Sequence, residues 1–313
     1  MQRRNALIIA GLGATAVVTA CGGGHDPEPV FVPNIVKLAQ TSPDLSILVE
    51  AVISAGLVDT LSGAGPFTVF APTNAAFAAL LVELGVTKEQ LLANKTLLTT
   101  VLTYHVVPGR VASTAIPFGK AITTVQGAIL KIDNVGGAVV ITDGRNRTSK
   151  VVTVDLGASN GVVHVVDKVI LPADKTIVQT AQALPQFSIL VEAVIAANLQ
   201  GTLSGPGPYT VFAPTNDAFA ALLTELGVTK AALLANTALL GKVLTYHVVS
   251  GRVLKADVPV NTPIPTVQGE TLTVNSSLAI VDQRGRISKI TATDVLTSNG
   301  VIHVIDKVIL PKP

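Results

Sequence analysis

The spacing of apolar positions changes along the chain, and each kind of spacing predicts a different element. In residues 45–53 apolar side chains recur every three or four positions, Glu50 falls on another face, and Gly56 follows as a stop. This spacing predicts an amphipathic helix. Residues 67–71 are rich in aromatic and β-branched side chains and predict a strand, which Pro72 closes.

Helix-capping residues follow this strand. Thr73 is the expected N-cap of a helix over residues 74–84, which Gly85 ends. The sequence Thr-Lys-Glu-Gln at residues 87–90 fits a capping box that opens a second helix. A third helix is expected over residues 97–103.

After Tyr104 the pattern becomes that of strands. Val, Ile and Thr alternate there, with turns expected at residues 143–144 and, further along the chain, at residues 283–285. Helices that precede strands predict the α+β class.

The whole pattern occurs twice. Three segments recur in the same order: residues 67–77 as 209–219, residues 102–107 as 244–249, and residues 160–172 as 299–311. The period is one domain long, so the sequence predicts two tandem domains, over residues 34–173 and 174–313. The linker at residues 173–175 is short, so we expect the domains to touch and to keep a restricted mutual orientation.

The offset between the copies shortens by three residues between Gln126 and Ile141. The lost residues surround Gly136-Gly137, which predicts a surface hairpin loop there.

Residues 1–21 have the features of a signal peptide. Arg3 and Arg4 precede an uncharged stretch over residues 6–20, which is shorter than the roughly 20 apolar residues needed to span a bilayer. A short apolar run after a basic start is typical of exported proteins, and an uncleaved membrane anchor is the alternative. The paired arginines also leave a twin-arginine export route open.

Residues 18–21, Val-Thr-Ala-Cys, resemble a bacterial lipobox. The resemblance implies that Cys21 is acylated and becomes the mature N-terminus, with residues 22–33 as a tether. Stable anchoring needs more than one acyl chain, which lipoprotein acylation supplies. Inner-membrane lipoproteins often carry Asp where this chain has Gly22, so we expect a lipid anchor in the outer membrane.

Charge and composition exclude several functions. The formal net charge of +2 includes Arg3 and Arg4, and without them 20 basic residues balance 20 acidic ones. The mature chain therefore lacks the basic footprint of a nucleic-acid-binding protein. Cys21 is the only cysteine, so the domains contain no disulfide.

No sequence motif predicts catalysis. A phosphate loop, a nucleophile elbow, a His-Glu-x-x-His motif and a cysteine pair are all absent. His105 with His164, and His247 with His303, supply at most two metal ligands in each domain. We therefore expect no enzyme activity, no cofactor and no metal site.

The three repeated segments resemble the signatures of the fasciclin family. Residues 67–77 are similar to its first signature, Tyr104-His105 to its Tyr-His motif, and residues 160–172 to its second signature. The resemblance implies two α+β domains, each a β-wedge of about seven strands flanked by helices. It also implies display outside the cell or in the envelope, and a role in adhesion or matrix contact.

The Tyr-His pairs have two interpretations. Tyr104, His105, Tyr246 and His247 lie in apolar surroundings, which favours buried, hydrogen-bonded side chains with a neutral imidazole. In animal members of the family the motif is linked to integrin binding, so the resemblance makes the four residues candidates for partner contact.

Other signature residues also favour structural roles. Thr73-Asn74 and Thr215-Asn216 predict helix capping, and Asn160-Gly161 and Asn299-Gly300 predict turns because both residue types tolerate positive φ. Strict alternation would place Asp167 among apolar residues, so we expect either a bulge or break of the strand near Asp167 or a buried, hydrogen-bonded carboxylate.

These observations lead to two hypotheses. The first is a non-enzymatic adhesion or interaction protein of the envelope or extracellular space, bound to the membrane through Cys21 and to a protein or glycan at the cell surface. The alternative is a carrier or sensor of a small apolar ligand. An exposed apolar patch across both domains would favour the first, and a closed pocket of a few hundred Å³ with convergent polar groups would favour the second.

Overall fold

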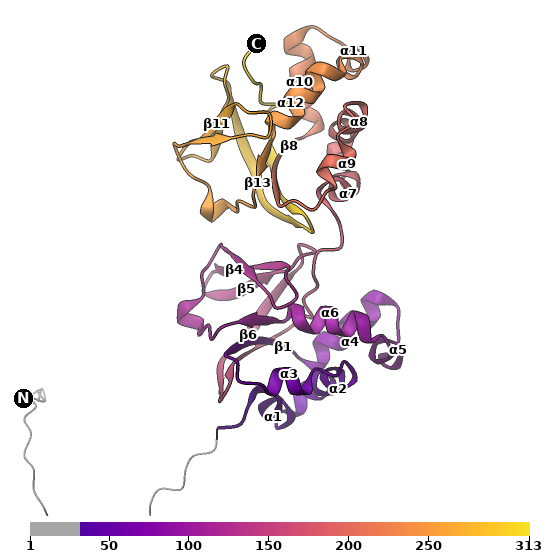
Figure 1. Ribbon diagram of the computed structural model, residues 1–313, viewed down its shortest axis with the longest axis vertical. Coiled ribbons are helices and arrows are strands. Elements are labelled where there is room, and N and C mark those ends of the chain that lie inside the picture. The colour runs from indigo at the N-terminus through magenta and orange to yellow at the C-terminus, as the bar shows by residue number, and fades with distance from the viewer. Residues whose placement is uncertain (1–31) are drawn as a thin grey trace, which may run out of the picture. The chain divides into compact units, whose positions relative to one another are not determined.

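The structure is a computed structural model that describes residues 32–313 (Figure 1). The predicted signal peptide, Cys21 and the first part of the predicted tether lie outside the described residues. None of the helices within residues 32–313 combines the length and apolar character required to cross a membrane.

The first domain is a seven-stranded sheet with helices packed against one face (Figure 1). Its strands are β1 (Phe67–Pro72), β2 (Val106–Pro108), β3 (Ala121–Thr123), β4 (Ile129–Val135), β5 (Ala138–Thr142), β6 (Thr148–Ala158) and β7 (Gly161–Val166). Its α-helices are α1 (Ile35–Gln40), α2 (Ser46–Ser54), α3 (Val58–Ser62), α4 (Asn74–Leu84), α5 (Lys88–Ala93) and α6 (Lys95–Tyr104). The strand order is β2-β1-β7-β6-β5-β4-β3, so the predicted α+β wedge of seven strands is confirmed.

Strands β1 and β7 lie side by side in parallel and are buried on both faces. Val69 and Ala71 of β1 face the helices and join the larger apolar core. Phe70, between them, faces the other side and joins a second core inside the wedge. A strand with a core on each face needs apolar residues at nearly every position, which explains why residues 67–71 have no polar alternation.

The capping residues act as the sequence predicts. The Thr73 hydroxyl accepts a hydrogen bond from the Ala76 N–H, and Gly85 ends α4 in the left-handed conformation. Thr87 and Gln90 form a complete capping box at the start of α5. The helix expected over residues 45–53 begins as a 3₁₀ turn at Pro43–Leu45 and continues as α2.

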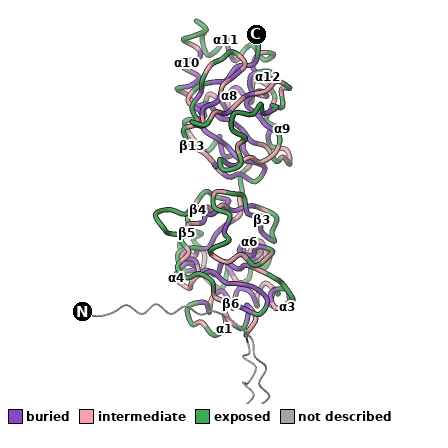
Figure 2. Tube along the Cα trace, turned by 90° about the vertical axis from the view of Figure 1, so that its left-hand side faces the viewer, coloured by how far each residue is buried: buried purple, intermediate pink, exposed green. Residues whose placement is uncertain are grey.

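The second domain repeats these elements. Its helices are α7 (Ile177–Gln182), α8 (Ser188–Ala196), α9 (Gln200–Leu203), α10 (Asn216–Leu226), α11 (Lys230–Ala235) and α12 (Thr237–Tyr246). Its strands are β8 (Tyr209–Pro214), β9 (Val248–Ser250), β10 (Pro263–Pro265), β11 (Thr271–Val274), β12 (Ala279–Val281), β13 (Ile287–Thr297) and β14 (Gly300–Ile305). In both domains the buried segments lie inside and the turns are exposed (Figure 2).

Two irregularities in the first sheet match expectations. Gly136 and Gly137, both with positive φ, form the turn between β4 and β5, where the second copy has a different loop. Strand β7 ends at Val166, and the Asp167 carboxylate beyond it accepts hydrogen bonds from the Ser149 hydroxyl and the Lys150 N–H. Because the strand ends before Asp167, this residue does not have to occupy an apolar position of the sheet.

The two domains are in direct contact. Lys131 Nζ lies 3.0 Å from an Asp294 carboxylate oxygen and 3.1 Å from Asp133. The Asn146 side chain pairs with the backbone of Leu296, donating at 3.0 Å and accepting at 2.6 Å. Beside these polar contacts lies a small apolar cluster drawn from both domains: Ile129, Leu254, Leu296 and Val301.

Candidate functional site

The first Tyr-His pair lies where α6 ends. Tyr104 is the last residue of the helix, and His105 is its C-cap. Leu98, Val101 and Leu102 form the buried face of α6, whose spacing turns Tyr104 toward the protein interior. Neither Tyr104 nor His105 is more than 1 % exposed, so the pair presents no surface to a partner in this fold.

Tyr104 connects the helix to the far part of the sheet. Its hydroxyl donates a hydrogen bond to the Ile129 carbonyl at 2.7 Å and accepts one from the Gly144 N–H at 2.8 Å. Burial raises the pKa of the phenol far above its ordinary value. The side chain is therefore a neutral, fully bonded link between α6, β4 and the turn that follows β5.

His105 is bonded at both ring nitrogens. Its Nδ1 lies 2.7 Å from the Val101 carbonyl, and its Nε2 lies 3.1 Å from the Ile170 N–H. A carbonyl only accepts and an N–H only donates, so the ring carries its proton on Nδ1. Burial lowers the pKa of the imidazole to about 4, and the ring is neutral at physiological pH.

The second pair repeats this arrangement. The Tyr246 hydroxyl donates to the Thr271 carbonyl at 2.9 Å. His247 Nδ1 lies 2.7 Å from the Val243 carbonyl, and its Nε2 accepts from the Ile309 N–H at 3.1 Å. Burial lowers the pKa of His247 to about 4.

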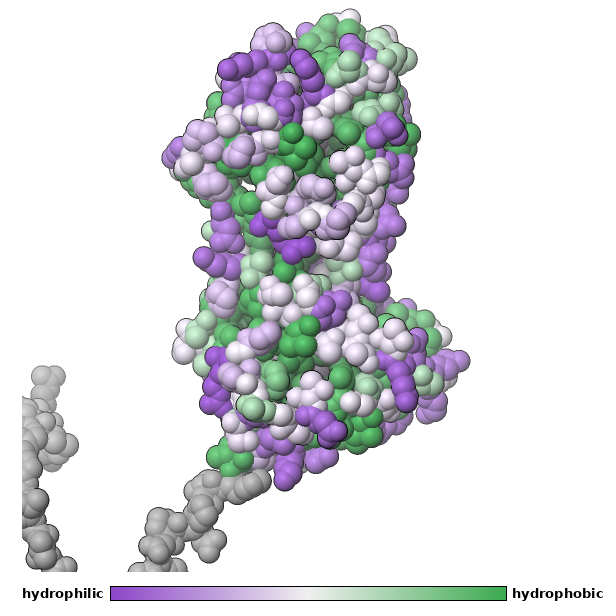
Figure 3. Space-filling model, in the orientation of Figure 1, coloured by the Kyte–Doolittle hydropathy of each residue, from purple (hydrophilic) through white to green (hydrophobic). Residues whose placement is uncertain are grey.

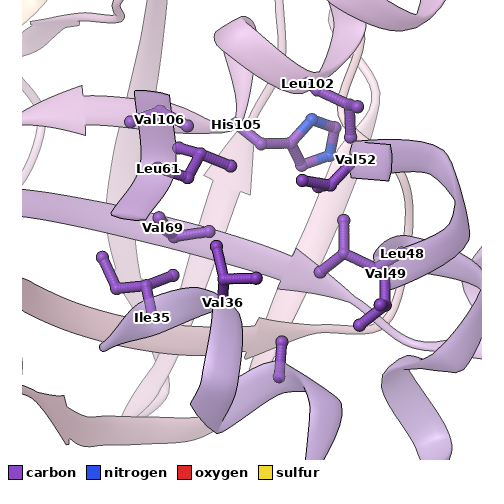
Figure 4. Close-up of a pocket in the computed structure, with 11 residues that line it drawn as sticks. Ile35, Val36, Leu48, Val49, Val52, Leu61, Val69, Leu102, His105 and Val106 are labelled. Carbon is purple, nitrogen blue, oxygen red and sulfur yellow. The ribbon is translucent and has the colours of Figure 1, made fainter. Parts of the chain in front are cut away.

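A small apolar cavity lies beside His105 (Figure 4). Side chains of α1, α2 and β1 surround it, including Val36, Val52 and Val69. Its volume is about 30 Å³, and the cavity beside His247 has the same volume. This is about the space that one water molecule occupies in the liquid, so neither cavity accommodates an organic ligand.

The other two histidines lie in the sheets. His164 of β7 accepts from the Asp155 N–H through Nδ1, and its Nε2 lies 2.9 Å from the Val111 carbonyl. His303 of β14 makes the equivalent bonds. Backbone groups thus occupy both nitrogens of all four rings, and within residues 32–313 no cluster of three metal-ligating side chains occurs.

A buried carboxylate beside Tyr104 was not singled out from the sequence. Asp143, 1 % exposed, accepts hydrogen bonds from the N–H groups of Arg145, Arg147 and Leu171, and forms an ion pair with the Arg147 guanidinium at 2.8 Å. Arg147 in turn pairs with Glu83. The sequence feature that could have indicated this carboxylate is an Asp four residues before an Arg at the predicted turn, which occurs in both copies. Asp143, together with Tyr104 and His105, joins α6, the β5–β6 turn and residues 170–171 into one hydrogen-bonded unit.

The signature asparagines have longer-range roles than predicted. The Asn74 side chain accepts from the Ile47 N–H and donates to the Pro43 carbonyl and the Ser46 hydroxyl, joining the starts of α4 and α2. The Asn160 side chain accepts from the Ile35 N–H and donates to the carbonyls of Leu61, in the last turn of α3, and Gly63, just after the helix.

The turns at Asn160-Gly161 and Asn299-Gly300 are present, but the expectation that they use a positive φ is wrong. None of these four residues has a positive φ. Gly161 is required because its backbone passes close to β1: a Cβ there would lie 2.1 Å from the Phe67 carbonyl oxygen. Gly300 meets Tyr209 in the same way.

A larger cavity lies between helices α4, α5 and α6 of the first domain. Its volume is about 280 Å³, and Arg145, Asp174 and Gln126 lie on its lining. The equivalent cavity of the second domain has a volume of about 70 Å³, with Arg284 in the place of Arg145.

Comparison with known proteins gives a consistent result. The family described as the fasciclin domain matches residues 43–172 and 185–311. The pig transforming growth factor-beta-induced protein ig-h3 is 32% identical over 253 residues, which are 80% of this chain and 35% of that protein. Human periostin is 28% identical over 94% of this chain and 34% of its own length. This chain thus spans about a third of the length of these relatives.

A bacterial relative is more similar over one domain. The protein sll1483 of Synechocystis is 48% identical over 139 residues, which are 44% of this chain and 73% of that protein. Among solved structures, a FAS1 domain pair from the insect cell adhesion molecule fasciclin I covers 85% of this chain and 97% of its own, at 17% identity and a TM-score of 0.44.

Proposed function

This chain belongs to the fasciclin family, and from that membership we propose that it is a non-enzymatic adhesion or interaction protein of the cell envelope or extracellular space. The observation that carries the proposal is the family match over both domains. The bonding of the Tyr-His pairs supports it, because their polar atoms are used to hold the fold together and are unavailable for chemistry.

Contact with a partner then falls to exposed side chains. On the face in view, apolar and polar side chains are interspersed (Figure 3). One apolar pair distinguishes the first domain: Val152 and Val154 of β6 are 56 % and 41 % exposed, whereas β13 has Thr291 and Thr293 at the equivalent positions. We place the contact surface of the first domain on this strand.

The test is retention of the purified, delipidated protein on envelope fractions and on neighbouring cells. The wild type is expected to be retained by a saturable component. The double variant Val152→Thr, Val154→Thr gives β6 the residues of β13 and is expected to lose most of that retention at unchanged thermal stability. Absence of saturable retention of the wild type would rule out the proposed function.

We also propose a lipid anchor at Cys21, with the outer membrane as its site. The proposal is supported by the lipobox-like sequence and by the absence of any other cysteine from the sequence. Cys21→Ser is expected to release the protein from membranes or to stall its processing, because no thiol remains to acylate. Intact-mass measurement of the native protein checks this, and an unmodified N-terminus beyond Cys21 would disprove the anchor.

The cavity between α4, α5 and α6 favours a second candidate function, a carrier or sensor of a small apolar ligand. Its volume of about 280 Å³ is close to the lower limit of typical ligand pockets, roughly 300–1,000 Å³. Thermal stabilisation by short apolar compounds tests this candidate, because a ligand that binds only the folded state raises the midpoint.

A further inference from the structure

We infer that the cavity between α4, α5 and α6 binds a medium-chain alkyl carboxylate, with the tail among the leucines and the head group on Arg145. The inference rests on the second candidate function and is independent of adhesion.

The cavity has an apolar floor. Phe77 and Leu80 of α4, Leu91 of α5, and Leu98 and Val101 of α6 line it and are all at most 5 % exposed. The side chains of this floor lack partner atoms for dispersion contacts on the cavity side. An alkyl chain would supply those contacts without burying a polar group.

Its polar groups lie at the rim. Gln126, Arg145 and Asp174 line the cavity and are exposed, as is the apolar Leu84 beside them, so this side is the mouth. The charged members are Arg145 and Asp174, which form an ion pair at 3.0 Å with side chains 34% and 50% exposed. A ligand that fills the floor must therefore bring its polar end to this pair.

The charge at the mouth selects the head group. A guanidinium binds a carboxylate through two parallel N–H···O bonds. The ion pair with Asp174 is the only one that Arg145 forms within residues 32–313. An exposed ion pair of this kind contributes little free energy, so a ligand carboxylate can displace Asp174 from Arg145. A cationic or neutral head group gains nothing there.

The second domain provides an internal control. Its cavity has the equivalent apolar residues, among them Phe219, Leu222 and Leu240, but a volume of only about 70 Å³. Arg284 is held by a hydrogen bond from its Nε to the Pro311 carbonyl at 2.9 Å. We therefore expect one ligand per chain, in the first domain.

The test is calorimetric titration of the full mature chain with sodium decanoate, and with decan-1-ol as the neutral match. Decanoate is expected to bind with a stoichiometry of one and more tightly than decan-1-ol. Arg145→Ala should weaken decanoate binding about 10-fold, because it removes a charge-assisted contact, and should leave decan-1-ol unaffected. Arg284→Ala, the matched control, should leave both affinities within about twofold.

Two further variants sharpen the test. Asp174→Asn removes the competing carboxylate and should tighten decanoate binding roughly 2- to 5-fold, an effect that general destabilisation would not produce. Leu98→Trp fills the cavity and should abolish binding, whereas Leu240→Trp in the second domain should not. The exposed rim variants keep the inference testable if Leu98→Trp fails to fold.

Three outcomes would overturn the inference. Equal affinity for decanoate and decan-1-ol, or an unchanged affinity of Arg145→Ala, would reject the carboxylate while leaving the carrier function standing. No saturable binding of either compound would reject the ligand class and the carrier function together. Retention on envelope fractions is measured separately and decides the adhesion proposal alone.

Discussion

At the scale of single residues, the histidines of the Tyr-His motif depart far from their behaviour in water. Each ring is buried, neutral and bonded to backbone groups at both nitrogens, and the burial lowers the pKa of both residues to about 4. An imidazole held in this way stabilises the turn around it. The residues that the family resemblance suggests as contact sites are thus buried and bonded to the backbone in this fold, which favours a structural role.

Replacing either histidine tests this reading. In His105→Ala the Ile170 N–H loses its acceptor, at a cost of about 1–3 kcal/mol, and the missing ring adds a cavity cost. His247→Ala should behave alike through Ile309. Denaturant unfolding and retention on envelope fractions are to be measured on the same proteins. Unchanged unfolding midpoints with abolished retention would make the motif a contact site.

The histidines also predict how stability depends on pH. Their folded-state pKa of about 4 lies below the ordinary value of 6.5, so the unfolded chain takes up protons first as the pH falls. The stabilisation is complete above pH 6.5 and is lost progressively between pH 6.5 and pH 4, by about 3 kcal/mol for each histidine. Urea midpoints of wild type and His105→Gln should therefore converge on acidification. Parallel pH profiles would contradict this, since the carboxylates common to both proteins cancel.

At the scale of helices and strands, local signals specified much of the fold. Thr73, Gly85 and the capping box at Thr87 marked helix ends correctly because a cap depends on residues within one turn. The roles of Asn74 and Asn160 could not be predicted in the same way, since their partners lie 27 to 125 residues away. The cavity between α4, α5 and α6 depends on how three helices pack, and no local pattern predicts its volume.

The link between α4 and α2 gives a prediction at this scale. Asn74→Ala leaves the part-buried Ile47 N–H without its acceptor, and should lower the stability of the first domain by about 1–3 kcal/mol. Asn216→Ala, which removes the same bond to Ile189, should act equally on the second domain. Hydrogen exchange at α2 and α8 separates the two effects. Equal loss of protection in both domains from one variant would show that the link is not local.

At the scale of the whole chain, the sequence predicted two repeated domains that touch, and the structure supplies their contacts. Lys131 with Asp294, Asn146 with Leu296, and the small apolar cluster join residues far apart in the sequence. Some of the residues that make these contacts are not the same in the two copies of the repeat. Leu296 corresponds to Gly157 in the first domain, and Lys131 corresponds to Thr273 in the second. The repeat therefore predicted the domains but gave no sign of the surfaces through which they meet.

Each half of the chain should fold alone. Residues 34–173 and 174–313 each contain a large apolar core, so each should unfold cooperatively when expressed separately. The second half should be less stable than in the intact chain, because Leu254, Leu296 and Val301 lose their contact with Ile129. Calorimetry of the halves and of the intact chain measures both effects. If neither half folds, the duplication is interdigitated and the domain boundaries are wrong.

Under the proposed function, in which the protein joins a lipid anchor to a partner, the position of β7 has a mechanical consequence. The chain enters the first domain beside the start of this strand, where Ile35 is bonded to Asn160, and leaves for the linker beyond its end at Val166. Tension between the tether and the second domain would therefore pull along β7. Because this strand is bonded to β1 on one side and β6 on the other, the load would fall on two rows of hydrogen bonds in shear, which must yield together rather than one at a time.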